Sequence, residues 1–212
     1  MRPVKPSLVL IQDEIRKSFG WALEDDIESA ENLANASVNP EPTISLQGTI
    51  TVVGANAPSN FKPEGPTIVA DGAVGAISDF SEVKLVVTDG DGFPFLQTAI
   101  DHGIPLCLHA HGDNRAEWEN VLGLIGTEYP IFKTHQTRKE IKGMYNPGGF
   151  TDGDRAVCIA LSLGAEKIEL VGFSTQEVGP WSGNTDKKRK LIKLKWMIKV
   201  LNELGLEVFD EN

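Results

Sequence analysis

The segment Lys84-Leu85-Val86-Val87-Thr88-Asp89-Gly90-Asp91-Gly92 joins a short apolar run to an acidic loop that contains glycine. Apolar residues bounded by turn residues predict a buried β-strand over 84–88. Two aspartates follow the strand at once. In parallel α/β sheets, ligands bind outside the carboxyl ends of the strands, so acids in this position indicate a functional site as well as a fold.

Similar apolar runs occur on both sides of this segment. We expect further strands at residues 49–53, 67–70, 105–108, 129–133, 167–171 and 206–209. Helical stretches are expected between them, at residues 94–102, 115–125, 152–163 and 186–204. Short apolar strands that alternate with helices predict an α/β fold, a doubly wound, mostly parallel sheet of the Rossmann-like type.

The N-terminal part of the chain has a different pattern. Apolar residues recur every three or four positions over residues 11–36, which predicts a helical stretch. Pro40 and Pro42 then interrupt this periodicity and indicate a linker. We therefore predict an N-terminal helical appendage at residues 1–46 and an α/β catalytic domain at residues 47–212.

The composition limits the classes of partner. The 212 residues carry a formal net charge of −10, which argues against nucleic acid, because phosphate backbones bind basic surfaces. Cys107 and Cys158 lie in apolar runs and are expected to be buried thiols in a reducing compartment. No apolar run is long enough for a signal peptide or a membrane span. We expect a cytoplasmic protein without a nucleic-acid or membrane partner, and a homodimer is left open.

Asp89 and Asp91 form an acid pair on a loop that Gly90 makes flexible. Carboxylates at this spacing can bind one or two Mg²⁺ ions, with phosphate oxygens of a substrate completing the coordination. The alternative is a tight turn, since Asp-Gly is a favoured turn dipeptide. Because the pair follows a buried strand, we favour the metal site.

A second polar cluster, His109-Ala110-His111-Gly112-Asp113-Asn114, follows the expected strand at 105–108. Two histidines and an aspartate could hold a transition metal, bind a heterocycle or supply a general base. The alternative is a polar strand end that leads to a helix cap. We favour a dual use, in which Asp113 or Asn114 caps the next helix while His109 and His111 face the site.

The glycine-rich segment at 146–156 precedes an apolar helix. Thr151 and Asp154 have the spacing of a capping box, and a helix N-terminus beside glycines can bind an anion. Because Asp152 and Asp154 are acidic, we expect a metal or a polar ring here rather than a bare phosphate. An ordinary capped helix is the alternative.

Two further segments could contact phosphates. Gly54-Ala55-Asn56-Ala57-Pro58-Ser59 follows the first strand of the sheet, where doubly wound folds place a phosphate loop, although a plain turn fits nearly as well. The basic residues Lys187, Lys188, Arg189 and Lys190 begin the last helix. Such a run is usually a solvated face, but in so acidic a chain one or two of these cations could clamp a polyphosphate. The segment at 179–184 is expected to be a mobile loop or lid.

Three of these segments together resemble a known family. Residues 87–92, 109–114 and 148–156 resemble the motifs of archaeal 6-hydroxymethyl-7,8-dihydropterin pyrophosphokinases, in the same order along the chain. The resemblance covers about residues 11–205 and includes Ala70-Asp71-Gly72-Ala73. The family usually has Gly-x-Gly-Pro-Ser in the first loop, where this chain is one residue longer and lacks the second glycine. Gly90 also stands where the family has a larger apolar residue.

The resemblance implies an enzyme that transfers pyrophosphate from ATP to the hydroxymethyl group of the reduced pterin and releases AMP. It implies a need for Mg²⁺ and a place in tetrahydromethanopterin or folate-type cofactor synthesis, with a catalytic part similar to thiamine pyrophosphokinase. Asp89 and Asp91 would hold Mg²⁺, Arg155 and the cations at 187–190 would neutralise charge, and Asp113 or a histidine would help to deprotonate the hydroxyl. The expected pterin contacts are Asp71, His109, His111, Asn114, Thr151, Asp152 and Asp154. The expected ATP contacts are Gly54, Ala55, Asn56, Ser59, Lys187, Lys188, Arg189 and Lys190.

Two other kinds of function stay open at this point. The same acid pair occurs in many nucleotide-using enzymes, so the chain could act on thiamine, or on an activated sugar as a nucleotide-sugar transferase. It could also be a non-catalytic nucleotide-binding module whose N-terminal helices contact a partner.

Overall fold

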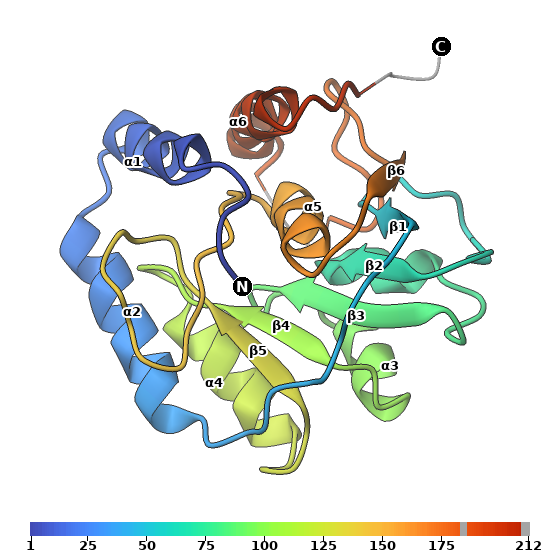
Figure 1. The fold of residues 1–212 in the computed structure, drawn as a ribbon, viewed down its shortest axis with the longest axis horizontal. Coiled ribbons are helices and arrows are strands. Elements are labelled where there is room, and N and C mark those ends of the chain that lie inside the picture. Colours follow the sequence, from blue (N-terminus) through green and yellow to red (C-terminus); the bar gives the residue numbers. More distant parts are fainter. Residues whose placement is uncertain (183–185, 209–212) are drawn as a thin grey trace.

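Six parallel strands form one sheet in the order β5-β4-β3-β2-β1-β6 (Figure 1). The computed structural model describes residues 1–182 and 186–208. The strands are β1 (Thr49–Val53), β2 (Thr67–Ala70), β3 (Val83–Thr88), β4 (Leu106–His109), β5 (Ile131–Thr134) and β6 (Lys167–Val171). The predicted α/β class with a doubly wound parallel sheet is therefore confirmed.

Burial on both faces explains why these runs form strands. Helices cover the two sides of the sheet, so its strands read as continuous apolar runs rather than as an alternation of polar and apolar residues. Every residue of β2, β4 and β5 is buried. Because all the strands point the same way, their carboxyl ends meet along one edge of the sheet.

The helices divide between the two faces of the sheet. The 3₁₀ helix η1 (Asp71–Ala76), α3 (Phe95–Asp101) and α4 (Arg115–Leu124) connect neighbouring strands on one face. On the other face, α5 (Asp152–Ser162) packs against β1, β2 and β3, and α6 (Lys187–Glu203) packs beside α5. The connection that contains α5 crosses the whole sheet from β5 to β6 (Figure 1).

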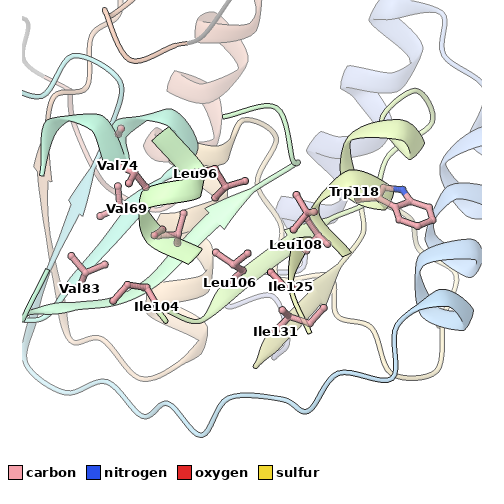
Figure 2. Packing of buried hydrophobic residues seen from close by; sticks show 14 of the residues in the cluster. Val69, Val74, Val83, Leu96, Ile104, Leu106, Leu108, Trp118, Ile125 and Ile131 are labelled. Atoms are coloured by element: carbon pink, nitrogen blue, oxygen red, sulfur yellow. The ribbon is translucent and has the colours of Figure 1, made fainter. Parts of the chain in front are cut away.

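An apolar layer lies on each face of the sheet. On the α3 and α4 side, Leu106 of β4 belongs to the same buried cluster as Leu96 and Trp118 (Figure 2). On the opposite side, Ile68 of β2 shares a cluster with Met197 of α6. These two layers fix the helices against the sheet and so determine which loops reach the carboxyl ends of the strands.

The N-terminal part forms two helices rather than one continuous stretch. α1 (Ser7–Phe19) ends at Gly20, which has a φ of 67°, and α2 (Leu23–Ala36) runs in a new direction. Glycine adopts this left-handed conformation without steric cost, so it stops the helix even though the apolar periodicity continues across it. α1 packs on α6, and α2 packs on α4 and β5.

Four smaller expectations concern the C-terminal strand, a loop, membrane spans and the domain boundary. Residues 206–208 form no strand, so the prediction of a closing strand is wrong for them, and Phe209 lies outside the described residues. Gly183 and Asn184 of the expected mobile loop also lie outside the described residues. Over residues 1–182 and 186–208, no helix combines the length and the apolar character needed to cross a membrane. The division between residues 46 and 47 stays a prediction.

Candidate functional site

A pocket of about 350 Å³ opens at the carboxyl ends of the strands. Its wall contains the loops that follow β1, β2, β3, β4 and β6, together with the start of α5. Residues of α6 and of the turn between α1 and α2 complete it. The fold therefore gathers most of the polar strand ends singled out in the sequence around one cavity.

Three carboxylates form an acidic cluster in this pocket. One oxygen from each of Asp71, Asp89 and Asp91 lies within 4.8 Å of the other two. Thr88 Oγ1 donates a hydrogen bond to Asp71 Oδ1 at 2.6 Å and accepts one from the Gly90 amide at 2.9 Å. Thr88, at the end of β3, is thus hydrogen-bonded both to the acidic loop that follows β3 and to the acid that follows β2.

The charges of this cluster strongly affect one another. Burial and the nearby carboxylates of Asp152 and Asp89 raise the pKa of Asp71 well above its usual range. Burial and the charge of Asp89 also raise the pKa of Asp91. Burial opposes ionisation of Asp89 as well, but its hydrogen bond to His111 and the charge of that ring hold the pKa of Asp89 below its usual range. A cation among these groups would relieve the repulsion that raises the first two pKa values.

The donor set of the cluster fits Mg²⁺. Carboxylate oxygens are hard ligands, which Mg²⁺ prefers, usually together with water and substrate phosphates. Asp89 Oδ1 is buried and has no hydrogen-bond partner among the described residues. The sequence assigned Asp89 and Asp91 to the metal, and the structure brings Asp71, assigned to the pterin, to the same point.

His111 links the acidic cluster to the loop after β4. Its ring contacts Asp113 Oδ1 at 2.8 Å and Asp89 Oδ2 at 3.4 Å. Burial alone would lower the pKa of His111, but the hydrogen bonds to Asp113 and Asp89 raise it to about 9. At neutral pH the ring therefore carries a positive charge. Asn114 fixes the loop, because its Nδ2 donates to the Asp89 carbonyl at 2.7 Å and its Oδ1 accepts from the His111 amide at 2.8 Å.

The start of α5 places Thr151 and Asp152 at the pocket and turns Asp154 and Arg155 away from it. Asp154 is fully buried, and it accepts hydrogen bonds from the Phe150 amide at 2.7 Å and the Thr151 amide at 2.8 Å in a capping box. Arg155 is 2% exposed and lies 3.3 Å from Asp152 Oδ1. Burial and the charge of Asp89 raise the pKa of Asp152 to about 7.

The loop after β1 comes close to the backbone that follows β6. Gly54, Ala55 and Asn56 line the pocket, whereas Ser59 is exposed and lies outside its lining. A side chain at Gly54 would collide with the Gly172 carbonyl, which explains the glycine there despite the absence of a regular phosphate-loop motif.

Not every expected contact reaches the pocket. Arg189 and Lys190 line it, whereas Lys187 and Lys188 are exposed outside its lining. His109 is fully buried behind the lining, with its Nδ1 3.1 Å from Thr134 Oγ1. The roles assigned to all the candidate residues from the sequence stay predictions.

Several residues of the wall were not singled out in the sequence. Among them are four aromatic residues and one basic residue: Trp21, Phe150, Phe173, Trp181 and Lys193. Lys193 follows Arg189 by one helical turn, so its helical spacing could have indicated it. The aromatic residues carry no such signal, because Trp21 reaches the pocket only through the tertiary packing of the N-terminal helices, α1 on α6 and α2 on α4 and β5.

The fold and the site define an α/β protein with a carboxylate-rich ligand pocket at the carboxyl ends of its parallel strands. No family model matches the chain. A protein of Pyrococcus furiosus is 32% identical over 186 residues, which cover 80% of this chain and 78% of the relative. A protein of Methanocaldococcus jannaschii is 30% identical over 193 residues, which cover 77% of each chain.

A protein of Methanothermobacter thermautotrophicus is 38% identical over 113 residues, which cover 52% of this chain and 47% of the relative. All three relatives are named 6-hydroxymethyl-7,8-dihydropterin pyrophosphokinase. The chain therefore belongs to the family of 6-hydroxymethyl-7,8-dihydropterin pyrophosphokinases.

Proposed function

We propose that this chain transfers the pyrophosphate of ATP to the hydroxymethyl group of 6-hydroxymethyl-7,8-dihydropterin and releases AMP. The hydroxymethyl oxygen attacks the β-phosphorus, and the bond from that phosphorus to the oxygen bridging the α- and β-phosphates breaks. The hydroxyl proton passes to a base, and AMP leaves with the bridging oxygen. The product would serve tetrahydromethanopterin or folate-type cofactor synthesis.

One observation carries this proposal: the same pocket is lined by an acidic cluster and by cationic side chains. Asp71, Asp89 and Asp91 would hold Mg²⁺, which supplies charge neutralisation on the phosphate oxygens when it is bound. Arg189 and Lys190 line the same pocket from the first turn of α6. Phosphoryl-type transfer depends mainly on positioning and on charge stabilisation, which these two groups provide together.

The proton of the attacking hydroxyl needs an acceptor in the pocket. His111 is already protonated at neutral pH, since the pKa of its ring is raised to about 9 by the hydrogen bonds to Asp113 and Asp89 against the effect of burial. Asp113 contacts His111 and lies on the pocket wall. The hydrogen bond to His111 lowers the pKa of Asp113, which keeps the carboxylate ionised as an acceptor must be but also makes it a weaker base. We assign Asp113 the task of accepting the proton, with the His111 cation stabilising the phosphates.

Several finer points belong to the same proposal. Arg155 would neutralise charge from behind Asp152, and Gly54, Ala55 and Asn56 would contact ATP. The chain would act in the cytoplasm without nucleic-acid or membrane partners. Sedimentation velocity of the purified protein tests the homodimer that the sequence leaves open.

Product analysis tests the function directly. The protein is incubated with ATP, Mg²⁺ and the reduced pterin, and nucleotides and pterins are separated by chromatography. We expect AMP and a pterin diphosphate in equal amounts, and a loss of at least about 100-fold for Asp91→Asn, as for removal of one group that stabilises a transition state. Asp79→Asn, at an exposed aspartate paired with Lys62, is the matched control.

Other products would point to other functions. Formation of ADP, or no turnover that depends on the pterin, contradicts the proposal. Thiamine and activated sugars are then the substrates to screen. ATP binding without turnover of any of them, unchanged in Asp89→Asn, would indicate a nucleotide-binding module instead.

A further inference from the structure

An aromatic surface on one side of the pocket is built from distant parts of the chain. Trp21 lies in the turn between α1 and α2 and lines the pocket. Its ring stacks on Phe19, with centroids 4.5 Å apart and planes 14° apart. The Phe150 ring lies 6.1 Å from Trp21. Phe19 covers one face of the indole, so a ligand can reach only the other face and the ring edge, where the Arg189 guanidinium also lies over the ring.

This aromatic surface adjoins the cations of α6. Arg189 Cζ lies 5.9 Å from the centroid of the Trp21 ring, and Lys193 Nζ lies 5.8 Å from that of Phe150. Arg189 also lies 3.9 Å from Asp113, the residue to which we assign the proton of the hydroxyl. A planar ring on Trp21 and Phe150 would therefore carry its substituent into the region where phosphates and the proton acceptor meet.

The turn that carries Trp21 is linked by hydrogen bonds and an ion pair to the loop that follows β4. The Trp21 amide donates to the Arg16 carbonyl at 3.0 Å, and the buried Arg16 side chain pairs with Asp26 at 3.0 Å. Asp26 Oδ1 in turn accepts a hydrogen bond from the Gly112 amide at 2.9 Å. Gly112 lies between His111 and Asp113, so one hydrogen-bonded network links the aromatic surface to the loop beside the acidic cluster.

The loops after β1 and β6 form another part of the pocket wall. There Gly54, Ala55, Gly172 and Gly179 lie together with the aromatic side chains of Phe173 and Trp181. A side chain at Gly54, Gly172 or Gly179 would collide with neighbouring backbone. Close approach of the backbone suits a nucleotide and its phosphates. The surface of Trp21 and Phe150, beside Asp113 and Arg189, is then the candidate position for the second substrate.

Resting on the proposed function, we propose that Trp21 and Phe150 form the platform for the fused two-ring system of the reduced pterin. Stacking on an indole favours any flat nitrogen heterocycle of that size, and the short connection to Asp113 and Arg189 places the hydroxymethyl group at the phosphates. The N-terminal helices would then contribute directly to the substrate site. Trp21 would determine affinity for the pterin and leave affinity for ATP unchanged.

Steady-state kinetics of Trp21→Leu test this assignment. We expect the KM for the pterin to rise about tenfold or more, as for the loss of one stacked aromatic platform, with the KM for ATP within twofold of wild type. Trp21→Phe keeps a smaller ring and should show a smaller rise with the same selectivity. Trp196→Phe is the matched control, because Trp196 lies on α6 outside the pocket lining.

Calorimetry gives a second readout that does not depend on turnover. The pterin alone and an ATP analogue with a methylene bridge between the α- and β-phosphates are each titrated into wild type and variants. Thermal melting first establishes that the variants are folded. If Trp21→Leu has a clearly lower melting temperature than wild type, the titrations with Trp21→Phe test the proposal instead. Weaker binding of the pterin alone, with analogue binding unchanged, supports the platform.

The remaining outcomes separate this inference from the proposed function. Weaker binding of the ATP analogue would show that the platform holds adenine, which overturns the inference. Unchanged binding of both ligands overturns it too. A wild-type protein that makes AMP and a pterin diphosphate while Trp21→Leu behaves normally refutes the platform alone, whereas a wild-type protein without this activity refutes the proposed function.

Discussion

Asp71 holds a backbone conformation that residues other than glycine seldom adopt, with a φ of 47°. Strain of this kind persists where the surroundings hold the residue and is concentrated at functional sites. Thr88 fixes the carboxylate, and a side chain at Gly92 would collide with it. Asp71 is thus held beside Asp89 and Asp91, which makes it the third candidate ligand for Mg²⁺.

Asp71→Asn tests this assignment at the residue scale. Asparagine tolerates a positive φ and can still accept the hydrogen bond of Thr88, so the fold should survive. We expect the Mg²⁺ concentration for half-maximal activity to rise about tenfold or more, since even partners outside the first coordination sphere contribute that much. Metal-dependent rates of the variant and of Asp79→Asn measure the effect. A raised KM for the pterin at unchanged Mg²⁺ dependence would instead place Asp71 on the pterin.

His135 should make the fold sensitive to acid. Burial lowers the pKa of His135 to about 4, and the charge of Asp26 opposes this only in part. Its Nδ1 accepts a hydrogen bond from the Thr137 amide at 3.3 Å, which requires the neutral ring. Below the unfolded pKa of about 6.5, the unfolded chain binds a proton that the folded chain excludes, so stability falls as the pH drops from about 6.5 to 4, by roughly 3 kcal/mol.

Replacing His135 by asparagine should reduce this loss, because the amide oxygen can still accept from Thr137 and does not titrate. Urea unfolding at pH 7 and pH 4.5 measures the change in the free energy of unfolding. His102→Asn, at an exposed histidine, is the control. An equal loss of stability in wild type and His135→Asn would show that other groups control the acid sensitivity.

At the scale of elements, the first turn of α5 contains one acid, Asp154, whose side chain serves to cap the helix. Both oxygens of Asp154 are engaged by the amides of Phe150 and Thr151. Asp154→Asn leaves one buried amide without an acceptor, so we expect a loss of about 1–3 kcal/mol in the free energy of unfolding. Urea unfolding measures it, with the exposed Asp101→Asn as control. A raised KM for the pterin at normal stability would support the pterin contact expected from the sequence.

The break between α1 and α2 gives a paired test with glycines. No atom lies within 4 Å of a side chain built at Gly20 or Gly123, so only the backbone distinguishes the two positions. Gly20→Ala forces a left-handed conformation at a helix end and should cost about 1 kcal/mol. Gly123→Ala lies within α4 and should stabilise the fold by roughly 0.5–1 kcal/mol. The melting temperatures of both variants test this difference. Shifts of the melting temperature in the same direction would contradict the argument.

At the scale of the whole molecule, the N-terminal helices share their apolar clusters with the sheet. Ala30 and Leu33 of α2 lie in the cluster that contains Leu106, and Leu8 of α1 shares a cluster with Cys158 of α5. A chain of residues 47–212 would expose these surfaces. We expect it to melt at least about 10 °C below the full chain, since burying each such side chain contributes about 1.5–3 kcal/mol. Equal melting temperatures would show that residues 47–212 fold independently.

The strands could be predicted because burial on both faces leaves an unbroken apolar run in the sequence. The acids of the pocket could be predicted for the same reason, since they directly follow such runs. The packing of α5 on the sheet could not be read from local sequence, and it decides that Asp152 faces the pocket while Asp154 and Arg155 do not. Trp21 was missed because its place depends on contacts of the N-terminal helices with segments far along the chain, such as α1 with α6 and Asp26 with Gly112.

Trp21, Arg189 and Lys193 all line the pocket. The ribosome synthesises Trp21 early and the two cations late. β6 likewise takes its place beside β1 only after the chain has crossed the whole sheet. A nascent chain with β1 to β5 already paired would still lack one wall of its binding site. A ligand of this pocket would therefore stabilise the finished molecule by binding to it, but it would lack its complete site during the first stages of folding on the ribosome.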